Sequence, residues 1–172
     1  MSLSDIREQH SELEQSVKDT HGFVFNHTML RVKDIEKSLA FYNQVLGFSL
    51  VDQRDFPENE FSLYFLAYVN ESTQVPEEDE ERRLWLAGQP GVLELTHNHG
   101  TEKEAGQVYH NGNDDPQGFG HICVSVPDIE AACARFEELG VDFKKRLTDG
   151  RMKNIAFIRD PDGYWIEIIA NH

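Results

Sequence analysis

Residues 25–50, FNHTMLRVKDIEKSLAFYNQVLGFSL, follow the same plan as residues 119–143, FGHICVSVPDIEAACARFEELGVDF. His27 and His121 lie 94 positions apart in these stretches, and Asp34 and Asp128 keep the same separation. Self-similarity at a fixed spacing indicates an internal duplication. The chain therefore contains two copies of one structural module.

The first copy predicts the order of elements within a module. Residues 21–32 have the pattern of a strand, and the apolar positions of residues 33–47 follow helical spacing, with Asp34 placed to cap the helix and Gly47 to end it. Further strands are predicted at residues 48–53, 61–68, 84–87 and 92–96. The fold class that follows is α+β, with two tandem βαβββ modules.

The duplication also predicts how the chain is divided. The first module spans residues 23–100, with a polar, acidic insertion at about residues 70–83, and the second spans residues 119–172. A Gly- and Asn-rich linker loop at residues 101–118 joins them. Residues 1–22 predict an N-terminal helical arm, because Ile6, Leu13 and Val17 form a narrow apolar stripe. A solvated tail is the alternative for the arm.

Composition narrows the class of protein. Hydrophobic residues make up 39% of the 172 residues, which is enough for a packed core, and no apolar run is long enough to span a membrane. The net charge of −15 argues against nucleic acid and anionic membranes as partners. No signal peptide is visible, and Cys123 and Cys133 are expected to be buried, reduced thiols of a cytoplasmic protein.

A His begins the first strand of each module, and a Glu lies within the last. The pairs are His27 with Glu94 and His121 with Glu167. Any one of them is most often an ordinary polar residue of a strand. Four of them at matched positions predict one metal site, because imidazole and carboxylate together suit a divalent ion such as zinc, nickel, cobalt or manganese.

Beyond these patterns, four strings in order along the chain resemble one family. They are LELTHN (93–98), YHNGN (109–113), GFGHI (118–122) and DPDGYWIEI (160–168). They are similar to glyoxalase I, the lactoylglutathione lyase of the vicinal-oxygen-chelate superfamily, and the likeness extends from about residue 23 to residue 169. The resemblance implies the glyoxalase fold.

The resemblance also assigns roles to residues. It implies metal ligation by His27, Glu94, His121 and Glu167, the first of which is Gln in the animal enzymes and His in many bacterial ones. It implies glutathione contacts at Arg31, Asn98, Lys145 and Met152, and an apolar substrate pocket of Phe56, Phe61, Leu63 and Trp165. Gln117 departs from the pattern, because the animal enzymes have an Arg there that contacts a carboxylate of glutathione.

The implied activity detoxifies methylglyoxal. Its hemithioacetal with glutathione, the co-substrate, is isomerised to S-D-lactoylglutathione by metal-assisted proton transfer through an enediolate. Glu167 is the expected base, and Glu94 is a ligand that serves the other stereoisomer. One divalent metal per site is implied, with zinc favoured by the arm and the insertion and with nickel or cobalt as alternatives. The family typically forms homodimers with sites at the subunit interface.

Two other functions are compatible with the same module. A non-haem iron dioxygenase needs two His and one carboxylate with open positions, and the second matched Glu argues against it. A metal-free ligand-binding or resistance protein of the same fold needs no ligand set, so it leaves the four residues unexplained. Fold alone does not separate these functions.

Overall fold

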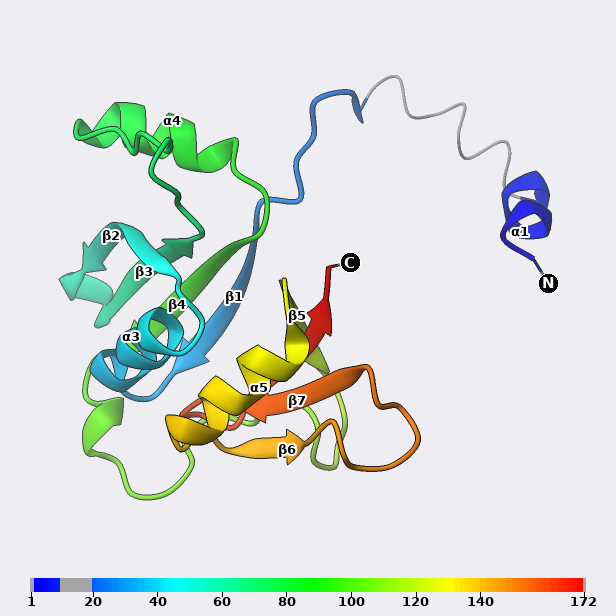
Figure 1. Cartoon of the computed structure of the whole chain (residues 1–172). Coiled ribbons are helices and arrows are strands. Elements are labelled where there is room, and N and C mark those ends of the chain that lie inside the picture. Colours follow the sequence, from blue (N-terminus) through cyan, green and yellow to red (C-terminus); the bar gives the residue numbers. More distant parts are fainter. Residues whose placement is uncertain (1, 10–19, 172) are drawn as a thin grey trace.

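Two four-stranded sheets form the body of the protein (Figure 1). The computed structural model describes residues 2–9 and 20–171. In spatial order, the first sheet consists of β1 (His27–Val32), β4 (Val92–Asn98), β3 (Phe61–Ala67) and β2 (Ser49–Phe56). The second sheet repeats this order with β5 (His121–Val126), β8 (Trp165–Ala170), β7 (Ile155–Arg159) and β6 (Phe143–Lys145).

Each sheet combines one parallel pair with antiparallel pairs. β1 is parallel to β4 and β5 is parallel to β8, while the remaining neighbours are antiparallel. Helix α3 (Ile35–Gln44) follows β1, and helix α5 (Ile129–Glu138) follows β5. The order βαβββ therefore occurs twice, which confirms the predicted fold class.

Matched residues begin and end the two helices. Asp34 accepts the backbone N–H of Lys37 at 3.3 Å, and Asp128 accepts that of Ala131 at 2.9 Å, so both are N-caps. After each helix the chain turns through a glycine of positive φ, Gly47 at 79° and Gly140 at 70°. Other residues adopt this backbone conformation at a cost, so these glycines end the helices.

Both modules contribute to one apolar core. In each sheet, alternate residues point to the face that the helix covers, as strand geometry requires. Leu30, Leu95 and Ile166 are among the residues at 3% exposure or less, and the cluster includes residues of both modules. The two modules therefore pack against each other as parts of one body.

The loop between β7 and β8 adds polar contacts between the modules. The hydroxyl of Tyr42 in α3 donates to Asp160 Oδ2 at 2.9 Å, in a buried position. The backbone N–H of Lys33 donates to Asp162 Oδ1 at 3.0 Å. These contacts tie the second module to the end of β1 and to α3.

The strand predicted at residues 84–87 is wrong. These residues belong to helix α4 (Asp79–Ala87). A short apolar run cannot be assigned to strand or helix by periodicity alone, and here the acidic residues of the first turn favour a helix by matching its dipole. Leu86 alone is buried on α4, while Leu84 is 72% exposed.

The remaining elements are short. They are the 3₁₀ helices η2 (Pro57–Asn59) and η3 (Thr101–Lys103) and the N-terminal helix α1 (Leu3–Gln9), which buries none of its residues. Ile6 of the predicted apolar stripe lies on α1, whereas Leu13 and Val17 lie outside the described residues. No helix in the described ranges is long and apolar enough to cross a membrane.

Candidate active site

One face of the first sheet carries the predicted site residues of the first module. In the strand register, Met29 pairs with Glu94 and Phe65 pairs with Glu94 from the other side. Side chains of paired residues share a face, and alternate residues along each strand return to it. The following predicted residues therefore lie on the face opposite α3: His27, Arg31, Phe56, Phe61, Leu63, Glu94 and Asn98.

The first half-site is built by His27 and Glu94. Nε2 of His27 lies 3.3 Å from Oε2 of Glu94, whose side chain is only 13% exposed. The ring of Phe65 meets the His27 ring edge to face, with centroids 6.3 Å apart. The two donor atoms therefore lie close enough to bind one ion, and an aromatic ring limits the movement of the imidazole.

Asn26 orients the imidazole of His27, a role that the sequence did not suggest. Nδ1 of His27 donates to Asn26 Oδ1 at 2.7 Å, which leaves Nε2 free to act as a ligand. The amide nitrogen of Asn26 donates in turn to the backbone carbonyls of Leu86 and Gln89, each at 2.7 Å. The end of α4 thus supports the half-site.

The second half-site repeats the first. Nε2 of His121 lies 3.3 Å from Oε2 of Glu167, whose side chain is 22% exposed. The ring of Phe157 packs edge to face against His121 with centroids 5.3 Å apart, in the place that Phe65 has in the first module. Phe65 and Phe157 pair in register with the two glutamates, so only strand pairing identifies them.

Cys123 differs from the prediction. It is exposed in the chain, whereas Cys133 is buried as expected. Cys123 pairs with Glu167 in the register of β5 and β8. Partial burial raises the pKa of the Cys123 thiol, and the adjacent Glu167 carboxylate raises it further, so the thiol remains protonated at neutral pH.

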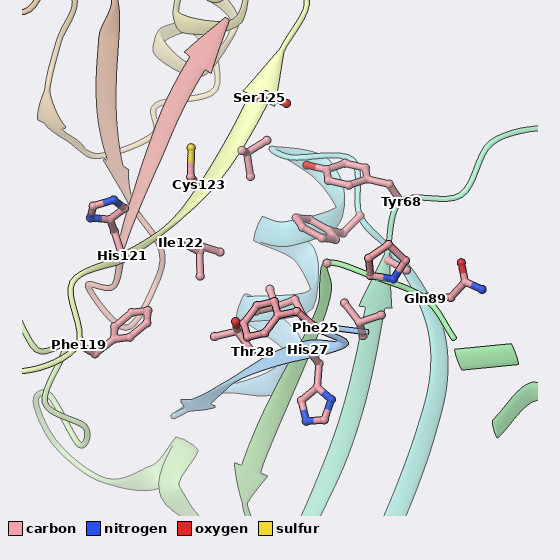
Figure 2. A pocket seen from close by; sticks show the side chains of 17 residues that line it. Phe25, His27, Thr28, Tyr68, Gln89, Phe119, His121, Ile122, Cys123 and Ser125 are labelled. Atoms are coloured by element: carbon pink, nitrogen blue, oxygen red, sulfur yellow. The ribbon is translucent and has the colours of Figure 1, made fainter. Parts of the chain in front are cut away.

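A single chain does not bring the two His–Glu pairs together. Within residues 2–9 and 20–171, no three His, Cys, Asp or Glu side chains are grouped closely enough to hold a metal ion. The histidines instead lie at different parts of a cavity of about 690 Å³ between β1 and β5 (Figure 2). Exposed Phe25, Tyr68 and Phe119 also line this cavity. Each module therefore presents a half-site.

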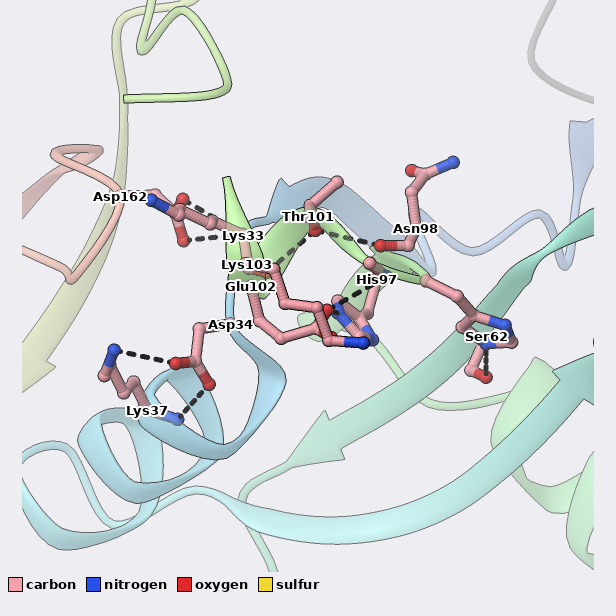
Figure 3. Close-up of polar contacts among 12 residues, drawn as sticks. Lys33, Asp34, Lys37, Ser62, His97, Asn98, Thr101, Glu102, Lys103 and Asp162 are labelled. Carbon is pink, nitrogen blue, oxygen red and sulfur yellow. Dashed lines mark hydrogen bonds and ion pairs between the residues drawn. The ribbon is translucent and has the colours of Figure 1, made fainter. Parts of the chain in front are cut away.

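The predicted glutathione contacts fall into two groups. Arg31 and Asn98 lie on the site face of the first sheet, and Asn98 accepts the hydroxyl of Tyr109 at 3.2 Å. Thr101 fixes the backbone here by donating to the carbonyl of Asn98 at 2.9 Å (Figure 3). Lys145 and Met152 lie together in the second module, where Nζ of Lys145 donates to the Met152 carbonyl at 2.6 Å.

The predicted substrate pocket is divided between the modules in the same way. Phe56 and Phe61 stack at the end of the β2–β3 hairpin with centroids 4.8 Å apart. Leu63 lies on the same face, and it lines a smaller cavity of about 250 Å³ together with His27 and Glu94. Trp165 lies in the second sheet, where it pairs with His121.

The donor atoms fit a divalent metal ion. Each half-site offers one imidazole nitrogen and one carboxylate oxygen at matched positions, and two half-sites together would offer two of each. This set suits zinc and its borderline neighbours. The hydrogen bond from His27 Nδ1 to Asn26 is of the kind that commonly supports a metal-bound His.

Comparisons with known proteins identify first the superfamily and then the family of this chain. A family model for the Glyoxalase/Bleomycin resistance protein/Dioxygenase superfamily matches residues 24–168. The lactoylglutathione lyase of Pseudomonas putida is 63% identical over 98% of this chain and 97% of its own length. That of Pseudomonas aeruginosa is 59% identical over 87% of this chain and 84% of its own. The chain belongs to the lactoylglutathione lyase (glyoxalase I) family.

A solved structure supports the same assignment. The trypanothione-dependent glyoxalase I of Leishmania major is 30% identical, and the match covers 86% of each chain with a TM-score of 0.62. The predicted family and enzyme class are thus confirmed. Glyoxalase I enzymes use a divalent metal ion and a glutathione substrate. Dioxygenases and bleomycin resistance proteins are other members of the superfamily, and the closely similar Pseudomonas relatives are lyases.

Proposed function

We propose that this chain isomerises the hemithioacetal of methylglyoxal and glutathione to S-D-lactoylglutathione, in a site that two half-sites complete. The observation that carries the proposal is the pair of His–Glu contacts at 3.3 Å, one in each module. Four donors would then surround one divalent ion, with His27 and Glu94 from one half-site and His121 and Glu167 from the other.

The proton transfer is assigned to a carboxylate. Glu167 takes the proton from one carbon of the hemithioacetal and returns it to the adjacent carbon, acting as a general base and then as an acid. Glu94 performs the same task for the other stereoisomer. A bound divalent ion supplies Lewis-acid polarisation of the neighbouring substrate oxygens. Phe65 and Phe157 hold the imidazoles in place.

The glutathione part of the substrate lies across both half-sites in this proposal. Arg31 and Asn98 hold it from the first module, while Lys145 and Met152 hold it from the second. Phe56, Phe61, Leu63 and Trp165 surround the small side chain of the 2-oxoaldehyde. Charge-assisted hydrogen bonds to the glutathione carboxylates give this contact set its strength.

A second copy of the chain is the proposed source of the missing half-site. A homodimer with twofold symmetry would apply the same contact twice and build two equivalent sites. The face that a partner would cover carries apolar side chains, because Phe25 is 83% exposed and Tyr68 is 53% exposed beside the half-sites. Exposed aromatic clusters of this kind commonly mark protein interfaces.

The first experiment tests the reaction and the metal together. The chain is stripped with a chelator, and thioester absorbance is followed with methylglyoxal and glutathione while single divalent ions are added back. We expect zinc to restore turnover, with nickel or cobalt as the alternatives. A folded protein that stays inactive with every ion would contradict the lyase assignment for this chain.

The second experiment tests the shared site. Glu94→Gln and Glu167→Gln are each expected to lose nearly all activity as separate proteins, because each replaces a carboxylate ligand of the metal that both stereoisomers need. When the two variants are unfolded together and refolded, mixed dimers would carry one doubly altered site and one intact site. Activity should return to about a quarter of the wild-type value, because half of the dimers are mixed. No recovery in such refolded mixtures would place all four ligands within one chain.

A further inference from the structure

We propose that the cavity beside Glu94 selects 2-oxoaldehydes whose side chain ends in an anionic group, and that Arg54 and Arg83 bind this group. The inference rests on the proposed function, because Glu94 marks where the aldehyde carbons react. It goes further by naming a substrate class beyond methylglyoxal. The cavity has a volume of about 250 Å³, which leaves room for a side chain longer than a methyl group.

The lining of this cavity is not purely apolar. Leu63 and Phe65 give it apolar walls, and His27 and Glu94 form its reactive end. Arg54 and Arg83 line the same cavity. The residues predicted for the substrate pocket were all apolar, so two guanidinium groups here change the chemistry that the cavity can recognise.

Arg54 is held ready to bind a ligand. Its Nε donates to Asp52 Oδ2 at 2.9 Å, and its guanidinium carbon lies 4.6 Å from the centroid of the Phe65 ring. The side chain is 28% exposed, and neither Nη atom makes a hydrogen bond to another described residue. A fixed guanidinium with two free donor groups suits a planar carboxylate or a phosphate.

Asp52 does not neutralise this region. Burial alone would raise the pKa of Asp52, but hydrogen bonds from Arg82 and Arg54 lower it below its ordinary value, so the carboxylate is charged. Arg82 donates to the same carboxylate at 3.0 Å and also pairs with Asp79. Asp52 is therefore shared between two guanidinium groups, and Arg83 adds a further positive charge on α4. This cationic lining stands out in a chain of net charge −15.

The position of the cavity indicates that it binds the side chain of the aldehyde and not the glutathione part of the substrate. Arg31, assigned to glutathione, lies four residues beyond His27 on β1, which is about 13 Å along a strand. Arg54 instead pairs with Leu63, two residues before Phe65, which is the partner of Glu94. A group bound by Arg54 would therefore extend from the carbons that react beside Glu94.

The kinetic test compares two substrates that differ in charge. The metal-loaded enzyme is given glutathione with 4,5-dioxopentanoate, whose side chain ends in a carboxylate, or with its methyl ester. We expect a higher kcat/KM for the acid than for the ester. The kcat/KM of the acid divided by that of the ester should fall about tenfold in Arg54→Met and in Arg83→Met. Arg7→Met is the charge-matched control, because it removes the same charge from α1, outside this cavity and away from the Asp52 hydrogen bonds. Its ratio should match that of the wild type.

A binding test adds a result that does not depend on turnover. Quenching of tryptophan fluorescence gives the Kd of S-(3-carboxypropyl)glutathione and of S-butylglutathione for the metal-loaded enzyme. The wild type should bind the carboxylate conjugate more tightly, and Arg54→Met should lose this preference. Arg83→Met repeats this binding test at an exposed position on α4. Because Arg83 is not a partner of Asp52, its replacement leaves the hydrogen bonds of Asp52 in place.

Specific outcomes would overturn the proposal. If Arg54→Met weakens the binding of both conjugates equally, Arg54 contributes to glutathione binding or to the stability of the sheet instead. A wild-type enzyme that prefers the ester, or does not distinguish it from the acid, would show that the cavity does not select anions. If methylglyoxal is still turned over in that case, the proposed function stands and only this inference fails.

Discussion

Asn26 shows how a single residue can distinguish the two half-sites. It fixes the His27 ring through Nδ1 and is itself held by carbonyls at the end of α4. The matching position before His121 is Gly120, which has no side chain for this task. The first half-site therefore has a hydrogen bond from the preceding side chain to its imidazole that the second half-site lacks, although the four ligands are symmetric in sequence.

We predict that Asn26→Ala lowers metal affinity by about tenfold or more, because an outer hydrogen bond that orients a His ligand is lost. Equilibrium competition with a chelator measures this change. Asn26→Asp is the matched control, since it keeps the Oδ1 acceptor for His27 but loses the amide donors to α4. If both variants lose affinity equally, the effect comes from α4; unchanged affinity in Asn26→Ala would refute the role of Asn26.

At the scale of elements, the N-caps of α3 and α5 are the clearest feature that both modules share. Asp34 and Asp128 begin α3 and α5 with the same backbone conformation and the same hydrogen bond to the third residue along. Each helix must start at the correct residue for its apolar side to reach the sheet. The burial of Tyr42 and Phe136, which are 0% and 2% exposed, depends on this starting position.

Asp128→Ala should lower the free energy of unfolding by about 1 kcal/mol, because the side-chain acceptor for the Ala131 N–H is removed. Urea denaturation with unchanged m-value measures the effect. Asp128→Asn keeps the acceptor and should stay near the wild type. A loss as large in the Asn variant as in the Ala variant would mean that charge, and not capping, accounts for the effect.

At the scale of the whole molecule, Asp160 connects the two modules in a buried position. Its carboxylate accepts the Tyr42 hydroxyl from α3 and the backbone N–H groups of Asp162 and Tyr164. Burial raises the pKa of Asp160 to about 7, and the nearby charge of Asp162 raises it further, although these three hydrogen bonds oppose the rise. The joint between the modules therefore contains a group that titrates near neutral pH.

This titration predicts how stability depends on pH. The raised pKa means that the folded protein retains a proton that the unfolded chain releases above its ordinary pKa of 3.8. The contribution of Asp160 to stability should therefore be fully present below about pH 4 and fall as the pH rises to about 7, by an amount on the order of a few kcal/mol.

Asp160→Asn removes the titrating group, keeps an oxygen acceptor for the backbone N–H groups of Asp162 and Tyr164, and places an amide N–H donor toward the Tyr42 hydroxyl oxygen. Urea unfolding of both proteins at pH 5 and pH 8 gives the difference in stability, in which the other titrating groups largely cancel. We expect the wild type to lose stability relative to the variant between these two pH values. A difference that is independent of pH, or that grows in the opposite direction, would contradict the raised pKa.

The sequence by itself determined the features that local patterns control. The repeat, the helix caps and the alternation that separates Leu93 from Glu94 all follow from neighbouring residues, and so the two βαβββ modules could be predicted. The His–Glu pairs were also accessible, because a duplication places chemically similar residues at matched positions. The strand predicted at residues 84–87 failed because four apolar residues do not distinguish a strand from the end of a helix.

Only the tertiary structure decided which distant residues meet. Cross-strand register places Phe65 beside Glu94 and Phe157 beside Glu167, and the docking of α4 brings Arg83 to the cavity of Arg54. The separation of the ligands into two half-sites is likewise a result of how two sheets pack. Such contacts depend on pairing between segments far apart in the chain, and the physical reason is that no local propensity specifies their register.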